Sequence, residues 1–166
     1  MTAVFYYQTE LGVISIEENG TALTKVYFGK PQLQCEADLR ETALLQEAGQ
    51  QVKEYLAGVR KDFTLPLAPE GTDFQQRVWA ALQEIPYGET RTYGEIAVSV
   101  GCLQGARAVG LANNKNPLLL FIPCHRVVGI KGKLVGYAGG IAAKEYLLKL
   151  EKEQVGGKSA GECCES

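Results

Sequence analysis

A cysteine stands next to the only histidine of this 166-residue chain, in the tetrapeptide Pro123-Cys124-His125-Arg126. Cysteine is an intrinsically strong nucleophile, although only a few per cent of a free thiol is ionised at pH 7. A nearby base that takes up the thiol proton increases that ionised fraction. The pair therefore favours nucleophilic chemistry at Cys124. Each residue taken alone also has an ordinary structural explanation, as a buried thiol or as a hydrogen-bonded core histidine.

The apolar run Leu118–Ile122 predicts a buried strand that ends at Pro123. Neighbouring side chains on a strand point to opposite faces, so Cys124 and His125 do not touch if the strand continues regularly. Proline lacks a backbone N–H, which makes a regular ladder through this point unfavourable. Two arrangements remain open: the backbone turns here, or a water molecule carries the proton between thiol and imidazole.

An imidazole that acts as a base needs an acidic residue to orient it. The apolar spacing predicts a helix from Ile141 to about Glu153. At about 100° per residue, Glu151 falls within the apolar stripe of that helix, whereas Glu145 falls at its edge. A carboxylate on a buried face needs a partner. We therefore expect Glu151, rather than Glu145, to face His125.

The sequence ahead of this site predicts three helices, at about residues 74–85, 92–100 and 104–114. Thr92 and Glu95 form a capping box, and Gly101 separates the last two helices. Two short helices across a glycine-containing turn predict a helix-turn-helix. Its second helix carries Arg107 among small side chains, which allow close approach to another surface. Residues 129–134 predict a wing-like turn with lysines at its tip.

Basic residues are concentrated around the same region. Residues 101–150 contain seven lysines and arginines but only one acid, Glu145, whereas the whole chain has a net charge of −2. A basic segment within an acidic protein suits an anionic partner, most often a nucleic acid. The alternative is that these charges only solvate one face of the protein.

The first 60 or so residues predict a small α+β unit with no cluster of residues that suggests chemistry. Asn19-Gly20 predicts a hairpin turn, because both residues tolerate positive φ. Thr64–Gly71, with two prolines and a glycine, predicts a linker. The expected elements are the strands Val4–Thr9, Gly12–Glu17 and Thr21–Phe28 and a helix from Glu36 to about Gly58.

Composition restricts the class of protein. Apolar residues make up 46% and charged residues 22%, which is typical of a globular chain and excludes wholesale disorder. The longest dense apolar run is too short to span a bilayer, and the N-terminus lacks the features of a secretory signal. Five cysteines without a CxxC spacing indicate free thiols in a reducing compartment. A single histidine makes a metal site unexpected.

Further segments accompany the hexapeptide Pro123–Val128 in a fixed order: Phe74–Trp79, Pro86–Thr90, Thr92-Tyr93, Ala106–Gly110, Asn116-Pro117, Gly136–Gly140 and Lys144–Leu148. Over about residues 72–151, this ordered set resembles the O6-alkylguanine-DNA alkyltransferases, also called methylated-DNA–protein-cysteine methyltransferases. The N-terminal half resembles the ribonuclease-H-like domain of that family more loosely.

The resemblance implies an α+β fold. A small ribonuclease-H-like α/β domain with its linker is expected at residues 1–71, and a helical winged helix-turn-helix DNA-binding domain at 72–155. Residues 156–166 are expected to form a disordered tail. The implied activity is direct-reversal DNA repair. Family members flip the damaged base out of double-stranded DNA and transfer the alkyl group from O6-alkylguanine, and also from O4-alkylthymine, to a cysteine. The thioether product is stable, so each molecule acts once.

The motifs carry the family's catalytic residues onto particular positions. Cys124 matches the alkyl acceptor, while His125, through a water molecule, and Glu151 match its activating relay. Asn116 matches the residue that ties the helix-turn-helix to the active-site strand. Tyr93 matches the tyrosine that helps to rotate the nucleotide and protonates a guanine ring nitrogen.

The resemblance also implies contacts to DNA through the minor groove. Arg107 matches the finger that fills the gap in the base stack, and the residues expected at DNA are Thr92, Tyr93, Ala106, Arg107, Ala108, Gly110 and Arg126. The expected pocket for the flipped base consists of Val127, Tyr137, Ala138 and Gly139. Many members have a serine where this chain has Ala138, so a hydroxyl contact to O6 is lost here.

The alkyl group is its own electrophile, so no cofactor is expected. The zinc ligands that some members carry are absent, so no metal is expected either. The protein is expected to be a monomer without a membrane contact, in the cytoplasm near the nucleoid, or in the nucleus if its source is a eukaryote.

Two other classes of protein remain as alternatives. A winged-helix protein with an inert thiol would recognise lesions without transferring anything. A cysteine hydrolase would turn over an ester or amide, but the basic helix-turn-helix counts against it.

Overall fold

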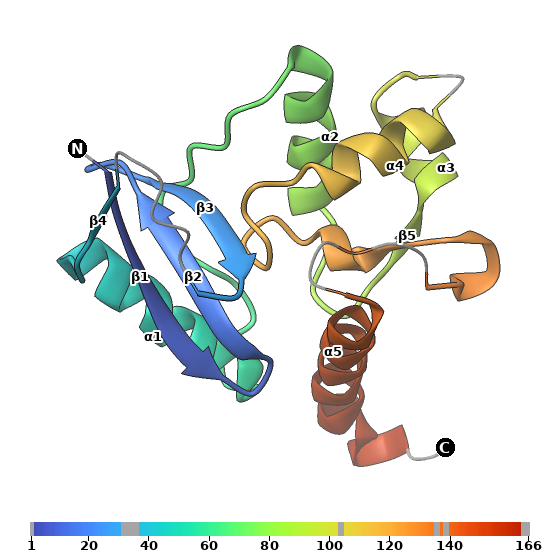
Figure 1. Cartoon of the computed structure of the whole chain (residues 1–166). Helices are drawn as coiled ribbons and strands as arrows, with labels where there is room; N and C mark the ends of the chain where they lie inside the picture. Colours follow the sequence, from blue (N-terminus) through green and yellow to red (C-terminus); the bar gives the residue numbers. More distant parts are fainter. Residues whose placement is uncertain (1, 31–36, 103–104, 135–136, 138–139, 164–166) are drawn as a thin grey trace.

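The structure, a computed structural model, describes residues 2–30, 37–102, 105–134, 137 and 140–163. Figure 1 shows a sheet with one helix against it, followed by a cluster of helices on the other side of a long connection. The last helix, α5 (Ile141–Cys163), stands below that cluster. A single hydrophobic core includes residues of both parts, among them Leu23, Tyr55 and Leu147.

The N-terminal sheet has four strands in the order β3-β2-β1-β4. The three predicted strands are confirmed as β1 (Thr2–Thr9), β2 (Gly12–Glu18) and β3 (Leu23–Phe28), and β2 pairs antiparallel with both of the others. The predicted turn follows β2, where Gly20 has a φ of 104° and the Asn19 side chain accepts hydrogen bonds from the backbone of Thr21 and Ala22. This local chemistry explains why the sequence located the turn.

The helix expected from Glu36 begins later. Residue 36 itself lies outside the described residues, and Ala37–Leu39 forms β4, which pairs parallel with β1. α1 (Ala43–Leu56) then starts after Thr42, whose side chain accepts a hydrogen bond from the Leu45 N–H. The edge of β1 offers β4 backbone partners distant in sequence, which local periodicity does not reveal.

The linker predicted at 64–71 has no helix, yet it is fixed to the sheet. The Leu23 N–H donates to the Pro66 carbonyl, and the Ala68 N–H donates to the Leu23 carbonyl. The connection therefore runs beside β3 before it reaches α2 (Asp73–Gln83). Both backbone bonds hold the linker against the N-terminal sheet.

The predicted helix-turn-helix is confirmed as α3 (Tyr93–Ser99) and α4 (Ala106–Asn114). The Thr92–Glu95 capping box has both of its reciprocal hydrogen bonds, and Gly101 has a φ of 74°. Just before α3, β5 (Arg91–Thr92) pairs parallel with β6 (Val127–Val128). This short ladder connects the helix-turn-helix to the segment after Cys124.

The prediction of a strand at Leu118–Ile122 is wrong. These five residues are buried but form a tight loop, in which Leu120 has a φ of 74° and the Ile122 N–H donates to the Leu118 carbonyl. Every side chain of a fully apolar run can be buried whether the backbone is extended or folded back. The apolar pattern therefore does not distinguish a strand from a folded loop. The chain then forms a single 3-10 turn, η1 (Cys124–Arg126).

Two further predictions concern the C-terminal third. The wing-like turn has its tip in a second 3-10 turn, η2 (Ile130–Gly132), closed by a hydrogen bond from the Gly129 N–H to the Lys133 carbonyl. α5 begins as expected but continues past Glu153, so residues 156–163, expected as tail, are helical in backbone. Two glycines at 156–157 lower helix propensity, but no proline blocks the helix there. Residues 164–166 lie outside the described residues.

Gly105, directly before α4, allows the close contact of the two helices. A Cβ at this position would lie 2.3 Å from the Ala97 Cβ and 2.4 Å from the Cys102 carbonyl oxygen. We predict that Gly105→Ala lowers the free energy of unfolding by about 1–3 kcal/mol through overpacking. The midpoint of urea denaturation measures the change.

Gly94→Ala is the matched control, because a Cβ at residue 94, inside α3, would meet nothing closer than 3.9 Å. Alanine is the better helix former, so this variant should be at least as stable as the wild type, by up to about 1 kcal/mol. Equal urea midpoints for the two variants would contradict the proposed packing.

Candidate active site

Cys124 lies at the start of η1 and is only 1% exposed. The backbone turns at this point, which is one of the two arrangements that the sequence left open. Asn116 supports the preceding loop: its Nδ2 donates to the Ile122 carbonyl at 2.9 Å, and its Oδ1 accepts from the Leu118 N–H at 2.9 Å. Asn113 Nδ2, from the end of α4, donates to the Cys124 carbonyl at 3.4 Å. The helix-turn-helix thus fixes the backbone that carries the thiol.

The surroundings of Cys124 favour its neutral form at rest. Burial raises the pKa of the thiol to about 11, although the Asn116 side chain, the charge of Lys144 and the Cys124 backbone act in the opposite direction. Lys144 is buried on α5, with its Nζ 5.8 Å from the centroid of the Tyr93 ring. Burial lowers the pKa of Lys144, while a thiolate at Cys124 would raise it. A cation next to the sulfur stabilises the thiolate once it forms.

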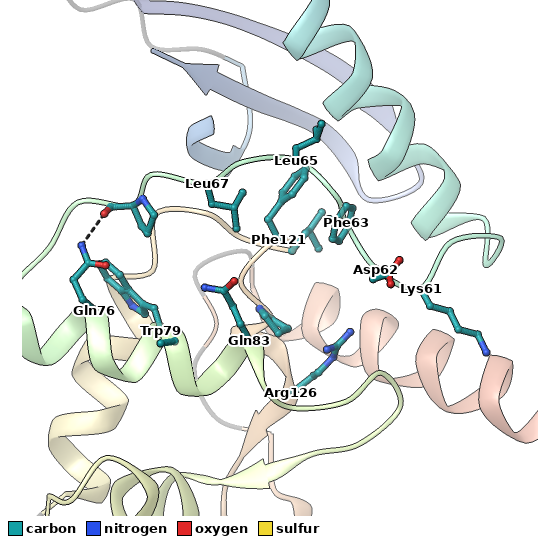
Figure 2. Close-up of a pocket in the computed structure, with 14 residues that line it drawn as sticks. Lys61, Asp62, Phe63, Leu65, Leu67, Gln76, Trp79, Gln83, Phe121 and Arg126 are labelled. Carbon is teal, nitrogen blue, oxygen red and sulfur yellow. Dashed lines mark hydrogen bonds between the residues drawn. The ribbon is translucent and has the colours of Figure 1, made fainter. Parts of the chain in front are cut away.

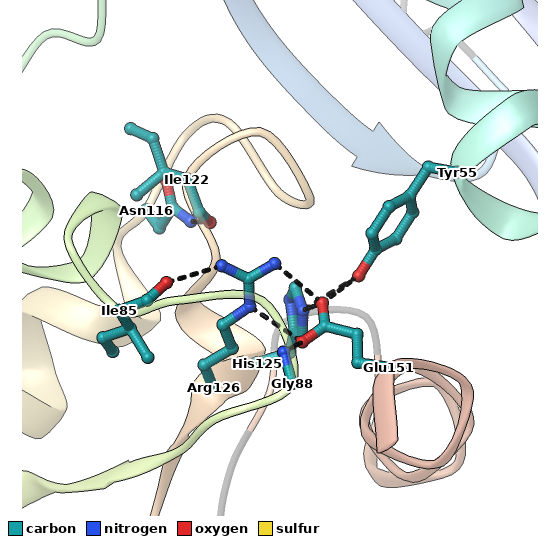
Figure 3. Close-up of polar contacts among 8 residues, drawn as sticks. All are labelled: Tyr55, Ile85, Gly88, Asn116, Ile122, His125, Arg126 and Glu151. Carbon is teal, nitrogen blue, oxygen red and sulfur yellow. Dashed lines mark hydrogen bonds and ion pairs between the residues drawn. The ribbon is translucent and has the colours of Figure 1, made fainter. Parts of the chain in front are cut away.

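Glu151 is the centre of a buried polar cluster (Figure 3), and it is 1% exposed. Its Oε2 accepts from His125 Nε2 at 2.8 Å and from Arg126 Nη2 at 2.9 Å. Its Oε1 accepts from Arg126 Nε at 2.9 Å and from the Gly88 N–H at 3.2 Å. The Tyr55 hydroxyl also donates to Oε2. The prediction that Glu151, and not the exposed Glu145, faces His125 is confirmed.

This cluster keeps Glu151 ionised. Burial raises the pKa of its carboxyl group, but the hydrogen bonds and charges of His125 and Arg126 outweigh burial and bring the pKa to about 2. Burial lowers the pKa of His125, against the opposing effect of Glu151. A neutral imidazole beside a carboxylate carries its proton on the nitrogen that donates, here Nε2. Nδ1 is then an acceptor, and it has no hydrogen-bond partner within the described part of the chain.

Arg126 requires a correction. The family resemblance implies a contact to DNA for Arg126, but its side chain is 8% exposed and donates to both Glu151 oxygens and, through Nη1, to the Ile85 carbonyl. Its guanidinium also lies 5.6 Å from the centroid of the Tyr87 ring. A two-pronged ion pair of this kind holds the guanidinium and the carboxylate in one defined relative orientation. Arg126 therefore balances the charge of Glu151 and does not face solvent.

Three residues of the site were missed from sequence. Tyr55 comes from α1, in the part of the chain where we expected no chemistry, and only the fold brings it to Glu151. Asn113 and Lys144 lie on helices that the sequence predicts correctly. Their positions inside the apolar stripes were the available signal, as it was for Glu151.

The other predicted site residues lie in two regions, one at the surface and one in the interior. On the surface, Arg107 and Ala106 are exposed at the start of α4, while Thr92, Tyr93, Ala108 and Gly110 are half-buried nearby. A Cβ on Gly110 would lie 3.9 Å from the Tyr93 ring, so these two residues are neighbours. In the interior, Val127 is buried, and the Tyr137 ring lies 6.5 Å from the His125 ring. Ala138 and Gly139 lie outside the described residues.

A separate cavity of about 490 Å³ lies between the connection at 61–69, α2 and the loop at 120–123 (Figure 2). Phe63, Trp79 and Phe121 form part of its wall, and Arg126 is at one end. Cys124 does not line it. This cavity is therefore not the place where a substrate would meet the thiol.

Two family profiles match the chain. A ribonuclease-like domain of 6-O-methylguanine DNA methyltransferase matches residues 4–69, and the DNA-binding domain of the same family matches residues 73–153. The chain belongs to the 6-O-methylguanine DNA methyltransferase family. The two-domain fold implied by the sequence resemblance is thereby confirmed, with a mixed α/β domain first and a helical DNA-binding domain second.

Curated relatives of this family are similar over nearly their full length. A methylated-DNA–protein-cysteine methyltransferase of Methanosarcina barkeri is 50% identical over 151 residues, which cover 89% of this chain and 96% of the relative. The constitutive enzyme of Bacillus subtilis is 45% identical over 153 residues, or 87% and 92% of the two chains. The crystal structure of Mycobacterium tuberculosis OGT in complex with DNA matches with a TM-score of 0.86 and 43% identity, covering 92% of this chain and 94% of that one.

Neither a membrane-spanning helix nor a metal-binding cluster is present among the described residues of this methyltransferase-family chain. Among the described residues, no helix is long and apolar enough to cross a membrane. The same part of the chain contains no group of three or more His, Cys, Asp or Glu side chains that could hold a metal ion.

The buried cluster predicts a large effect of removing the Glu151 charge. Glu151→Gln leaves Arg126 buried without its counter-charge, so we predict a loss of about 3–5 kcal/mol in the free energy of unfolding. Glu145→Gln makes the same chemical change on an exposed position of α5 and should have little effect. Urea denaturation at neutral pH measures both variants, and equal losses would contradict the role of the cluster.

Comparison of Glu151→Gln with the wild type also isolates the pH dependence of the stability that ionised Glu151 contributes. Because the folded protein holds the pKa of Glu151 near 2, below the ordinary 4.5, its stabilisation is complete above pH 4.5 and is lost as the pH falls toward 2. The difference in stability between the wild type and Glu151→Gln should therefore shrink across that window.

Proposed function

We propose that this protein repairs DNA directly, by transferring the alkyl group of O6-alkylguanine, and also of O4-alkylthymine, to Cys124. The observation that supports Cys124 most directly is its position beside a buried His125–Glu151 pair, whose imidazole Nδ1 is free to accept a proton. Relatives that match over nearly their full length are named methylated-DNA–protein-cysteine methyltransferases. A recognition protein with an inert thiol would not need a buried acid–base pair at this residue.

The transfer is a single in-line displacement. The Cys124 thiol passes its proton to His125 through a water molecule, and Glu151 stabilises the imidazolium that forms. The sulfur then attacks the saturated carbon of the alkyl group, so a C–S bond forms and the C–O6 bond breaks. The bonding electrons leave with the guanine oxygen. The thioether has no good leaving group, so the protein acts once.

Tyr93 completes the proton balance on the guanine side. Burial raises the pKa of its phenol, and a negative charge at Cys124 raises it further, while a hydrogen bond with Asn113 opposes both. The phenol therefore stays protonated at neutral pH and can donate to a ring nitrogen of the departing guanine. Tyr137, which is buried near His125, and the buried Val127 are the described residues proposed to line the pocket for the flipped base.

The DNA partner is proposed to bind at α4 through its minor groove. The exposed Arg107 fills the space in the base stack when the alkylated nucleotide rotates out, and the small residues Ala106, Ala108 and Gly110 let the helix approach the groove closely. Unstacking costs a few kcal/mol, which these contacts must offset. A relative from M. tuberculosis has been crystallised with DNA.

The protein is further proposed to act as a monomer in the cytoplasm near the nucleoid, or in the nucleus of a eukaryote. The transfer needs one thiol and one lesion, and all the residues assigned to it come from a single chain.

A labelled substrate tests the transfer. The protein is incubated with a duplex that carries one O6-methylguanine with an isotopically labelled methyl group, and the digested protein is analysed by mass spectrometry. We expect one label per molecule on the Cys124 peptide. Cys124→Ala should bind the duplex without acquiring a label, whereas Cys102→Ala, the same change at a free cysteine outside the site, should be labelled normally. Transfer by Cys124→Ala, or tight binding without any label in the wild type, would overturn the proposal.

A second experiment tests the role of Arg107. Arg107→Ala should slow repair of duplex DNA by about tenfold or more, while its reaction with free O6-methylguanine base stays within about twofold of the wild type. The reason is that the free base needs no extrusion from a stack. Lys131→Ala, which removes an exposed charge on the wing, should weaken duplex binding modestly and mainly at low salt. Equal losses of Arg107→Ala on both substrates would contradict a flipping role.

A further inference from the structure

Tyr55 brings the N-terminal domain into the acid–base cluster. It lies on α1, is completely buried, and donates its hydroxyl hydrogen bond to Glu151 Oε2 across 96 residues of sequence. The same hydroxyl oxygen lies 3.2 Å from His125 Nε2. Within the described residues, the other donors to Glu151 come from the C-terminal domain (Figure 3). Tyr55 therefore touches both members of the pair.

The surroundings of Tyr55 restrict its ring. Just after α1, a Cβ on Gly58 would lie 2.5 Å from Gln154 Nε2 of α5, so the Gln154 side chain would have to shift to admit it. The Tyr55 ring packs against Phe63 at 5.3 Å and against Tyr87 at 6.1 Å between ring centroids. The phenol is thus held by its ring, and its hydroxyl is fixed in position relative to Glu151.

Glu151 Oε2 accepts from three donors at once: Tyr55, His125 and Arg126. A carboxylate oxygen has two lone pairs, so the three donors compete for its charge. A stronger hydrogen bond from the phenol to Oε2 therefore weakens the hydrogen bond from the imidazole to the same oxygen. The charge available to stabilise a protonated imidazole consequently depends on Tyr55.

We propose that Tyr55 is a positioning residue that shares Glu151 with His125 and thereby limits the proton affinity of the imidazole, keeping it neutral and ready to accept the Cys124 proton. The consequence for catalysis rests on the function proposed above, but the effect on His125 does not. The N-terminal domain would then take part in the chemistry through α1, beyond its structural role.

Other groups also face His125 and must be kept constant in a test. Glu151 and Lys144 act on it from α5, Arg126 from its own turn, and Tyr137 from the loop before α5. Tyr55→Phe changes none of these groups and keeps the buried ring, so it removes only the hydroxyl.

The single histidine of the chain makes the measurement direct. With a purification tag that lacks histidine, the only imidazole signal in a carbon- or nitrogen-labelled NMR sample is His125. We expect Tyr55→Phe to raise its pKa by about 0.5–1 unit, because Glu151 is then free to stabilise the imidazolium. Tyr7→Phe is the matched control: its hydroxyl donates to Glu41 and to the Leu45 carbonyl on the same helix, away from the site. It should leave the His125 titration unchanged.

The rate of alkyl transfer from free O6-methylguanine base gives a second readout. The acid limb of its pH profile should move upward by the same 0.5–1 unit in Tyr55→Phe, with the plateau within about threefold of the wild type. A purely structural role would lower the plateau or the stability and leave both titrations in place. An unchanged His125 titration in folded Tyr55→Phe would overturn the proposal.

A second variant, which retains the hydroxyl group, keeps the proposal testable even if Tyr55→Phe does not fold. Incorporation of 3-fluorotyrosine at position 55 makes the phenol a stronger donor, so the His125 pKa should fall, opposite to the shift in Tyr55→Phe. A shift in the same direction, or none, would also overturn the proposal. If the wild type transfers no label to Cys124, the proposed function fails, whereas the NMR result on Tyr55 still decides whether the hydroxyl controls His125.

Discussion

The structure around the active site depends on one buried carboxylate. A charge that is 1% exposed is tolerated only when hydrogen bonds and a counter-charge replace its water, and Glu151 obtains both. Its donors come from three segments: Tyr55 from α1, Gly88 from the turn after α2, and His125 and Arg126 from the turn that carries the nucleophile. Together with α5, which carries Glu151, four segments must occupy fixed relative positions. The requirement therefore defines the geometry of the site more narrowly than hydrophobic packing does.

Burial also explains why several different groups surround Cys124. A dry environment holds the thiol in its neutral form and protects it from reagents in solution, but it also opposes the thiolate that attacks carbon. Lys144 and the His125–Glu151 pair act against that penalty from two sides, one as a cation and the other as a proton acceptor. Asn113 and Asn116 hold the backbone, so that the helices predicted to contact DNA and the nucleophile move as one body.

Sequence reasoning succeeded where a local signal determined the outcome. The Thr92–Glu95 capping box, the Asn19-Gly20 turn and the position of Glu151 in an apolar stripe each depend on residues within one or two helical turns, and each is confirmed. It failed where distant partners decided the result. β4 forms because β1 offers an edge, and Arg126 turns inward because Glu151 lies there. The apolar run at 118–122 fits a strand and a folded loop equally well, so its pattern did not predict the loop. Tyr55 had no local signal, since the nearest member of its cluster in sequence is Gly88.

The long separation between Tyr55 and Glu151 has a consequence for biosynthesis. A chain emerges from the ribosome with its N-terminus first, and domains fold as they appear. α1, the helix-turn-helix and the thiol are all synthesised before α5 supplies the carboxylate. Until then His125 has no orienting acid and Arg126 has no counter-charge, so a nascent chain carries the nucleophile without its relay. Because the acid comes from the last described helix, the relay is complete only after that helix has been made.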